Sequence, residues 1–280
     1  MSEVPMGSRD DVLAGGGTGG TTSSPMAFPI PADELGTVSI VPNGSFEAGS
    51  YQTFVLTYVA GKFGIDDSGS MRVCFRFASD QTRPQFEDPK GPNYTTIEAS
   101  NNAVLTYHYD PKGNVRPWDR TLYIKVVRGF LREGDKITIT FGDRSGGSPG
   151  MRLQTFCEDS YEFHTLIDPI ATYCYQPMPV QPVIKIIPGK PDRYLAVAPT
   201  IRAIDESFSI KFKGEDKWGN PSDQCDCQLT VRASHPIDGL PDSVSLKPGQ
   251  FAGVITGLRV HEAADLVIEF FDEAGVLQCA

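Results

Sequence analysis

The chain has 280 residues and a formal net charge of −10 at pH 7, and this length suits one large or two ordinary domains. The acidic balance disfavours nucleic acid and anionic membrane surfaces as partners, because both would be repelled at long range. We find no apolar run long enough to cross a bilayer and no secretion signal. We therefore expect a cytoplasmic protein, without a membrane contact, whose six cysteines are free thiols.

Composition divides the chain into four parts. Residues 1–27 are expected to be a disordered leader, because a run of glycine, serine and threonine offers no apolar side chains to offset the entropy of ordering. Residues 177–182 carry three prolines, which stiffen the backbone and remove donors from a β-ladder. We expect this Pro-rich linker to separate a first β-sandwich domain, residues 28–176, from a second, residues 183–280.

Apolar and polar residues alternate with a period of two in both expected domains. In Met71–Phe77 the apolar side chains would share one face of a strand, while two arginines point the other way. Repeated short strands of this kind predict an all-β protein with two antiparallel β-sandwiches. Further strands are expected at Leu122, Ile124 and Val126; Ile137, Ile139 and Phe141; Tyr161, Phe163 and Thr165; Phe208, Ile210 and Phe212; and Cys227, Leu229 and Val231.

Three connecting segments carry weaker signals. Gly61–Gly69 and Arg132–Asp135 are expected to be hairpin connections, because glycine and aspartate tolerate the backbone angles of turns. His261–Glu273 could start as a helix or continue as a strand, and its strand-forming surroundings favour the strand.

A glycine-dense loop, Gly142–Phe156, is the strongest candidate for a contact site, because glycine permits sharp turns and close approach to a partner. It lacks the lysine of a phosphate-binding loop and an evident helix after it. An anion at Arg144, Ser145 and Arg152 is one interpretation, and a turn at Asp143 and Arg144 held by local hydrogen bonds is favoured over it. The candidate contact side chains of this loop are Asp143, Arg144, Ser145, Ser148, Arg152 and Gln154.

Aromatic residues lie close in sequence to a second candidate, the turn Arg116-Pro117-Trp118. Exposed flat rings on a sandwich can stack against sugars. Buried aromatics are, however, common core anchors of sandwiches, and this interpretation is favoured. The rings concerned are Tyr107, Tyr109, Trp118 and Tyr123.

Residues for catalysis or metal binding are sparse. The four histidines, His108, His164, His235 and His261, are isolated from one another. Cys225 and Cys227 have the wrong spacing for half of a zinc site and no second pair to complete it. Cys157 has acidic neighbours and no basic residue that would lower the pKa of its thiol. We expect no catalytic residue, no metal ligand and no cofactor in this chain.

Five segments also carry a resemblance to a known family: Phe63–Asp67, Cys74–Asp80, Val115–Trp118, Phe141–Phe156 and Asp216–Pro221. Together they resemble the N-terminal region of an uncharacterised bacterial hydrolase family, whose catalytic part belongs to the PHP-type metal-dependent phosphoesterases. The similarity covers about residues 35 to 280. In that family the metal-binding domain follows this region, so none of its ligands matches a position here. The resemblance therefore implies an accessory portion that lacks the active centre.

The second domain is also similar to bacterial immunoglobulin-like modules, in which a turn like Asp216–Pro221 joins strands. In this turn Gly219 would permit the reversal and Trp218 would cover the edge of the core. Such modules act as scaffolds and spacers.

These observations favour a non-catalytic accessory or docking region of a PHP-type metal-dependent hydrolase. Its partner would be the hydrolase domain, in the same polypeptide or in another, and the contact would use Arg116, Trp118 and the glycine-dense loop. One alternative is a metal-dependent hydrolase that gathers His108, His164 and scattered carboxylates. Another is a module that binds carbohydrate or a small ligand. The sequence also leaves open whether the chain forms a homo-oligomer.

Overall fold

The computed structural model describes residues 30–280, so the expected leader at residues 1–27 lies outside the described residues. The described chain is essentially all β, which confirms the predicted fold class. Its single helical element is a short 3₁₀ turn, Ala32–Glu34. Within residues 30–280 no helix has the length and apolarity that a membrane span needs.

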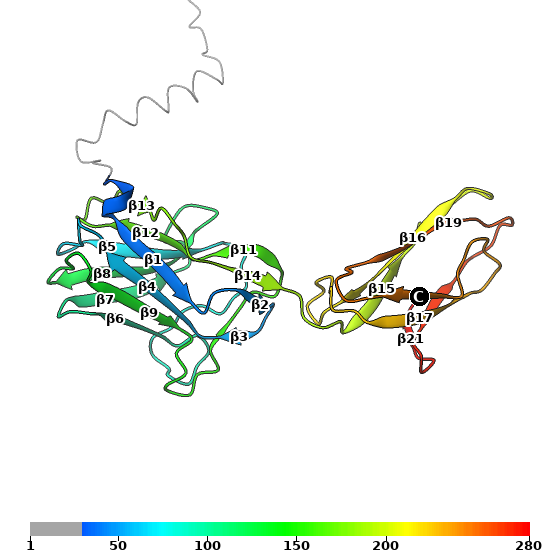
Figure 1. The fold of residues 1–280 in the computed structure, drawn as a ribbon, viewed down its shortest axis with the longest axis horizontal. Coiled ribbons are helices and arrows are strands. Elements are labelled where there is room, and N and C mark those ends of the chain that lie inside the picture. The colour runs from blue at the N-terminus through cyan, green and yellow to red at the C-terminus, as the bar shows by residue number, and fades with distance from the viewer. Residues whose placement is uncertain (1–29) are drawn as a thin grey trace, which may run out of the picture.

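Two groups of strands, each with its own core, follow one another along the chain (Figure 1). The first group comprises β1 (Gly36–Val41), β2 (Ser45–Glu47), β3 (Tyr51–Gln52), β4 (Phe54–Ala60), β5 (Ser70–Phe75), β6 (Thr95–Ala99), β7 (Val104–Asp110), β8 (Arg120–Arg128), β9 (Lys136–Phe141), β10 (Met151–Arg152), β11 (Glu158–Glu162), β12 (His164–Asp168), β13 (Gln176–Pro177) and β14 (Val183–Ile187). The second comprises β15 (Arg193–Val197), β16 (Phe208–Glu215), β17 (Cys227–Ala233), β18 (Ser243–Leu246), β19 (Gly253–Leu258), β20 (Ile268–Phe271) and β21 (Leu277–Cys279).

The first domain is built around two antiparallel sheets with the strand orders β1-β4-β9-β6 and β13-β12-β5-β8-β7. The inward residues of both sheets form one apolar core, as the alternating pattern predicts. Phe163 lies at its centre, and its ring centroid is 5.5 to 5.7 Å from those of four other aromatic residues: Phe54, Phe75, Phe141 and Tyr161. The predicted inward sets at residues 71–75, 122–126 and 137–141 are buried.

Two details of the first domain differ from the expectation. Phe77 is 46% exposed, because β5 ends at Phe75 and the chain turns away from the core. The segment around Phe163 is two strands, since β11 pairs with β14 while β12 pairs with β5. Phe163 stands where the chain passes from a third sheet, β11-β14-β2, to the sheet that contains β12. Its ring packs against Phe54, Phe75 and Phe141 of the two core sheets.

The expected hairpin connections are also wrong. The segment Gly61–Gly69 joins β4 to β5, and Arg132–Asp135 joins β8 to β9. In both cases the two strands belong to different sheets, so each connection crosses the sandwich. Turn residues mark where a strand ends, but they do not specify which sheet the next strand joins.

The Pro-rich segment 177–182 lies within the first domain. The strand that follows it, β14, pairs antiparallel with β11 and parallel with β2. Its residues Ile184 and Ile186 are buried in the first core, together with Met178. The chain therefore leaves the first domain after Ile187, and the expected boundary at residues 177–182 falls too early.

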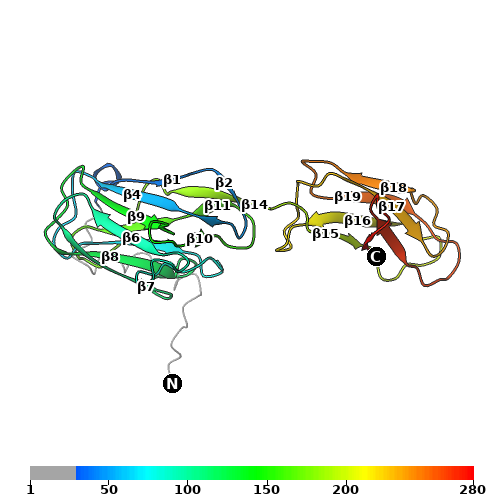
Figure 2. The same cartoon turned by 90° about the horizontal axis from the view of Figure 1, so that it is seen from below.

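The second domain packs a three-stranded sheet, β15-β16-β19, against a four-stranded sheet, β18-β17-β20-β21 (Figure 2). Phe212 and Phe270 stack between them with ring centroids 6.1 Å apart. Of the ambiguous segment His261–Glu273, only Ile268–Phe271 is a strand. The residues before it form an irregular border of the domain.

We predict that Phe163→Ala lowers the free energy of unfolding of the first domain by about 3–5 kcal/mol, because it removes a buried ring and leaves a cavity. Phe251→Ala, at an exposed ring, is the control, with an expected change within about 0.5 kcal/mol. Urea unfolding followed by circular dichroism measures both, and equal effects would contradict the central role of Phe163.

Candidate functional site

The turn that carries Trp118 is fixed against the segment after β5. The N–H of Phe77 donates a hydrogen bond to the carbonyl of Pro117 at 3.0 Å. The indole of Trp118 stacks on the His164 ring, with centroids 4.8 Å apart and planes 16° apart. The guanidinium of Arg76 also lies over the indole, 5.1 Å from its centroid. The Trp118 ring is therefore held against Arg76, which follows β5, and against His164 at the start of β12, and it already contacts two polar groups.

Arg76 joins this turn to the end of the glycine-dense loop. It forms an ion pair with Glu158 at 3.0 Å, and Glu158 accepts a hydrogen bond from the Gln154 amide at 3.0 Å. The structure thus connects two candidate residues from separate segments, Trp118 and Gln154, through side chains that the sequence prediction did not include.

Asp80 fixes the same loop from a second point. Its carboxylate accepts hydrogen bonds from the N–H of Thr155 at 2.8 Å and from its hydroxyl at 2.9 Å. Arg152 donates to the Asp80 carbonyl at 2.6 Å. Burial raises the pKa of Asp80, but the bonds from Thr155 and the charge of Arg152 outweigh it and hold the pKa below its usual value.

The first half of the glycine-dense loop is fixed both by its own hydrogen bonds and by bonds to residues of β3 and β6. Asp143 accepts from the N–H of Ser145 at 2.9 Å and from the Thr96 hydroxyl at 2.9 Å. Arg144 donates to the carbonyl of Tyr51 at 2.9 Å. Ser148 is buried and accepts from the N–H of Gly150. The bond from Ser145 to Asp143 matches the local-turn interpretation, but Arg144 bonds to a distant strand. Arg144 and Arg152 each donate to a different backbone carbonyl, so both are already engaged.

The candidate residues therefore fall into two groups. Trp118 and Gln154 are connected through Arg76 and Glu158, with Arg116 beside Trp118 in the chain and Arg152 held separately by Asp80. Asp143, Arg144, Ser145 and Ser148 belong to a separate turn. We call the exposed residues Arg76, Phe77, Val115 and Arg116, together with the half-buried Trp118, the tryptophan surface. The Arg116 guanidinium lies over the Phe77 ring, 4.9 Å from its centroid.

A second constellation lies where the domains meet, at the turn Asp216–Pro221. Asp216 is buried, and its carboxylate accepts hydrogen bonds from the N–H groups of Trp218 and Asn220, both at 2.9 Å. The N–H of Gly189 donates to the same carboxylate at 3.1 Å. One acidic side chain thus closes its own turn and ties it to the connecting segment.

The turn presents Asn220 and Trp218 to the first domain. Asn220 donates to the carbonyl of Thr155 at 2.8 Å and accepts from the N–H of Cys157 at 3.1 Å. The indole N–H of Trp218 donates to the carbonyl of Ala48 at 3.0 Å. The side chain expected to cover the core edge of the second domain therefore binds the first domain instead, close to the candidate loop.

The histidines proposed for the enzyme alternative lie far apart. His164 is on β12 and His108 is on β7, with β5 and β8 between them. Three strand spacings separate the two by roughly 14 Å, which is too far for one ion. Among residues 30–280, no group of three or more His, Cys, Asp and Glu side chains is placed to hold a metal.

Cys157 is poorly suited to nucleophilic chemistry. Burial raises the pKa of its thiol to about 11, and the carboxylates of Asp216 and Asp159 contribute to the increase. The thiol is therefore protonated at neutral pH.

Comparison of the chain with protein-family models finds no match, and comparison with curated proteins finds no significant relative.

Gly49 gives a direct test of the junction between the domains, which we define as the contacts of Trp218 and Asn220 with the first domain. Its φ is +68°, and an added Cβ would lie 2.5 Å from the indole nitrogen of Trp218. We predict that Gly49→Ala displaces Trp218 and broadens the distribution of distances between the domains. Gly44→Ala is the matched control, because Gly44 also has a positive φ of +121° but has nothing within 4 Å of an added Cβ. Pulsed electron spin resonance on one spin label per domain measures the distribution, and identical results for both variants would contradict the prediction.

The junction should also weaken in acid. Burial raises the pKa of Asp216, but its hydrogen bonds outweigh burial, and the net pKa lies below the usual value of 3.8. A carboxyl group with a lowered pKa in the folded state stabilises that state above its unfolded pKa and loses this contribution as the pH falls. We therefore predict that the distance distribution broadens as the pH falls below the usual aspartate value of 3.8. Asp216→Asn should reduce this pH dependence, and an unchanged dependence would contradict the assignment.

Proposed function

We propose that this chain is a non-catalytic accessory region that docks a PHP-type metal-dependent hydrolase domain, in the same polypeptide or in another. The observation that carries this proposal is the tryptophan surface, where Phe77, Val115 and Arg116 are exposed around the fixed ring of Trp118. Aromatic residues and arginine are enriched at protein interfaces and at their energetic centres.

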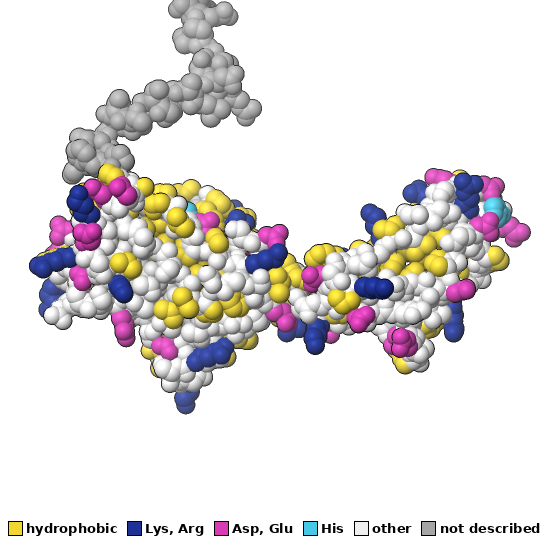
Figure 3. Space-filling model, viewed as in Figure 1, with side chains coloured by type: hydrophobic (Ala, Val, Ile, Leu, Met, Phe, Trp, Pro, Cys, Tyr) yellow, Lys and Arg dark blue, Asp and Glu magenta, His cyan; other side chains and the backbone are white. Residues whose placement is uncertain are grey.

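The backbone under the tryptophan surface favours docking. The N–H of Phe77 donates a hydrogen bond to the carbonyl of Pro117. The segment that follows is anchored by hydrogen bonds from Thr155 and Arg152 to Asp80. A partner would meet side chains on an ordered backbone, so little conformational entropy would be lost on binding. Figure 3 shows acidic and basic side chains interspersed on the visible face, with no single large charged area on that side.

The tryptophan surface suits a protein better than a sugar. A sugar platform needs a bare ring face, and Trp118 already has His164 stacked on it and Arg76 over it. These contacts leave the edge of the indole and the neighbouring Phe77 and Arg116 for recognition, which is the mixed chemistry of protein interfaces.

We further propose that the second domain is an immunoglobulin-like spacer. Its seven strands divide into sheets of three and four, the numbers found in the smaller immunoglobulin-type sandwiches. The junction at Asn220 and Trp218 supports a spacer that holds a defined orientation.

We predict that the chain binds a separately expressed PHP-type hydrolase domain and that Phe77→Ala weakens this binding by about tenfold or more. Phe130→Ala is the matched control. Both phenylalanines are 46% exposed, and each has an arginine over its ring, at 4.9 Å for Phe77 and 5.1 Å for Phe130. They lie beyond opposite ends of β8, so only Phe77 belongs to the tryptophan surface.

Isothermal titration calorimetry measures the affinities, and thermal melts show that each variant is folded. Absence of a complex at tens of micromolar, or equal losses for both variants, would contradict the proposal. Stoichiometric bound metal with phosphoester turnover by the purified chain would favour the enzyme alternative instead.

A further inference from the structure

Another polar cluster lies on the outer face of the sheet β13-β12-β5-β8-β7. The inner face of this sheet carries Met71, Val73, Leu122 and Ile124 of the first core, so the alternate residues of β5 and β8 face outward. The pairing register sets three outward pairs directly opposite one another: Ser70 and Lys125, Arg72 and Tyr123, and Cys74 and Thr121. Arg72 therefore stands in the middle of this outer face, with β12 on one side of its strand and β8 on the other.

The Arg72 side chain is held in place by aromatic rings and an amide. Its guanidinium carbon lies 3.7 Å from the centroid of the Tyr175 ring and 5.7 Å from that of Tyr123. The hydroxyl groups of Tyr175 and Ser70 are joined by a hydrogen bond of 2.6 Å. Asn114 accepts a hydrogen bond of 3.4 Å from Nη1 of Arg72. A guanidinium that stacks on a ring still presents the N–H groups of its edge, so Arg72 is positioned for recognition.

The positive charge of Arg72 has no counterion within the described part of the chain. Its Nε is buried and has no hydrogen-bond partner there, and no carboxylate of residues 30–280 forms an ion pair with the guanidinium. Asp168 lies opposite Ser70 on β12, but its carboxylate already accepts from the N–H groups of Thr172 and Tyr173 at 2.9 and 2.7 Å.

The hydroxyl of Tyr175 does not supply the missing charge either. Burial raises the pKa of Tyr175 to about 12, so the phenol is neutral at neutral pH. Arg72 therefore pays the cost of a partly buried cation, and nothing among residues 30–280 offsets that cost with an opposite charge.

Two further basic side chains border Arg72. Lys125 stands diagonally from it on β8, a spacing that long side chains can span. His108 lies opposite Tyr123 on β7, with the two ring centroids 5.1 Å apart. Neither forms an ion pair with any of residues 30–280. Asp110, at the end of β7, accepts from the N–H of Lys112 in its own turn at 2.8 Å. In a chain of net charge −10, this cluster is a local site of unmatched positive charge.

We propose that the outer face at Arg72 is a binding site for an oxyanion, namely the carboxylate or phosphate group of a small molecule. The edge of the guanidinium donates charge-assisted hydrogen bonds to the oxygens of the anion, and Lys125 adds a second positive charge beside it. The anion supplies the counterion that the described chain does not. This site does not rest on hydrolase docking, because Arg72 is not part of the tryptophan surface.

The test titrates the purified full chain, at pH 7.5 and constant ionic strength, with sodium phosphate and separately with sodium acetate. Two-dimensional ¹⁵N NMR follows the Nε–H signal of Arg72. We expect a saturable shift with a Kd of about 1 mM or lower for at least one anion. The anion that binds more tightly gives the chemical class of the ligand. Absence of a saturable shift with both anions would overturn the proposal.

Arg72→Gln should weaken anion binding at least about tenfold, because a neutral amide cannot replace charge-assisted hydrogen bonds. Arg232→Gln is the matched control. Arg232 also lies over an aromatic ring, 4.7 Å from the Phe271 centroid, and also has no ion pair among residues 30–280. The backbone amide signals of Tyr123 and Tyr175 report binding in both variants.

Arg72→Lys separates the effect of geometry from that of charge. It keeps the positive charge but loses the planar fork, so binding should weaken by several-fold without being abolished. Thermal melts show that each variant is folded. An equal loss in Arg72→Gln and Arg232→Gln, or an Nε–H signal of Arg232 that saturates with the same Kd as that of Arg72, would overturn the proposal, because it would show that any exposed guanidinium binds the anion.

Discussion

The buried carboxylate of Asp216 is the interaction on which the arrangement of this protein depends. A buried charge is tolerated when hydrogen bonds replace the water that it has lost, and here the donors come from the turn itself and from the connecting segment. The same carboxylate accepts from the Asn220 amide at 2.9 Å. It therefore orients the side chain that reaches the first domain, and a local feature of one loop determines how two sandwiches meet.

Much of the fold could be predicted from the period-two alternation, because an inward residue at every second position is required wherever one face of a strand is buried. The inner residues of β8 and β9 show this directly. Alternation does not encode which sheet a strand joins, and both supposed hairpins cross the sandwich for that reason. The prolines of residues 177–182 predict a domain boundary that the structure does not have there. The side chain of Gln181 replaces the missing ladder bonds with hydrogen bonds to the backbone of Thr165.

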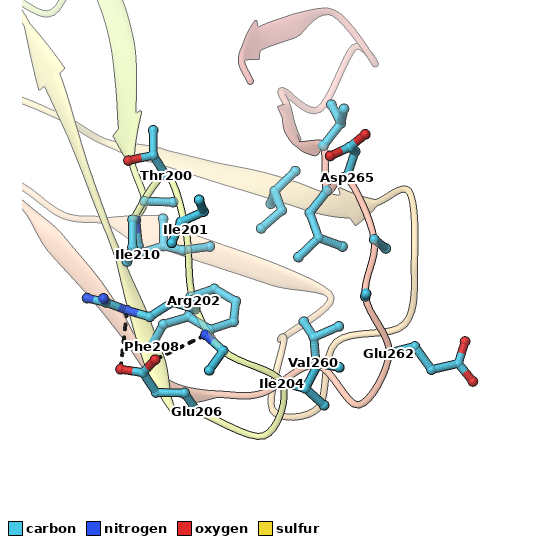
Figure 4. Close-up of a pocket in the computed structure, with 18 of the residues that line it drawn as sticks. Thr200, Ile201, Arg202, Ile204, Glu206, Phe208, Ile210, Val260, Glu262 and Asp265 are labelled. Carbon is cyan, nitrogen blue, oxygen red and sulfur yellow. Dashed lines mark hydrogen bonds and ion pairs between the residues drawn. The ribbon is translucent and has the colours of Figure 1, made fainter.

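The candidate site was predictable only in part. Glycine, aspartate and arginine do mark a fixed loop. Asp143 satisfies the loop backbone locally, as aspartate commonly does, whereas Arg144 donates to the distant carbonyl of Tyr51. Trp118 is connected to Gln154 through Arg76 and Glu158, and Arg152 is held by Asp80. The positions of Arg76 and Asp80 follow from the end of β5. The groove of the second domain that residues 198–206 and 260–267 line (Figure 4) had no signal in the sequence, since its walls are irregular segments that the packing of the two sheets brings together.

The parallel pairing of β14 with β2 has a practical consequence for anyone who wants to study the first sandwich alone. A recombinant version cut at the prolines would lose β14 and leave the backbone edges of β11 and β2 bare. Bare edges invite intermolecular pairing, and Ile184 and Ile186 would also be missing from the core. A soluble fragment therefore requires Val183–Ile187, even though that strand lies beyond the apparent linker.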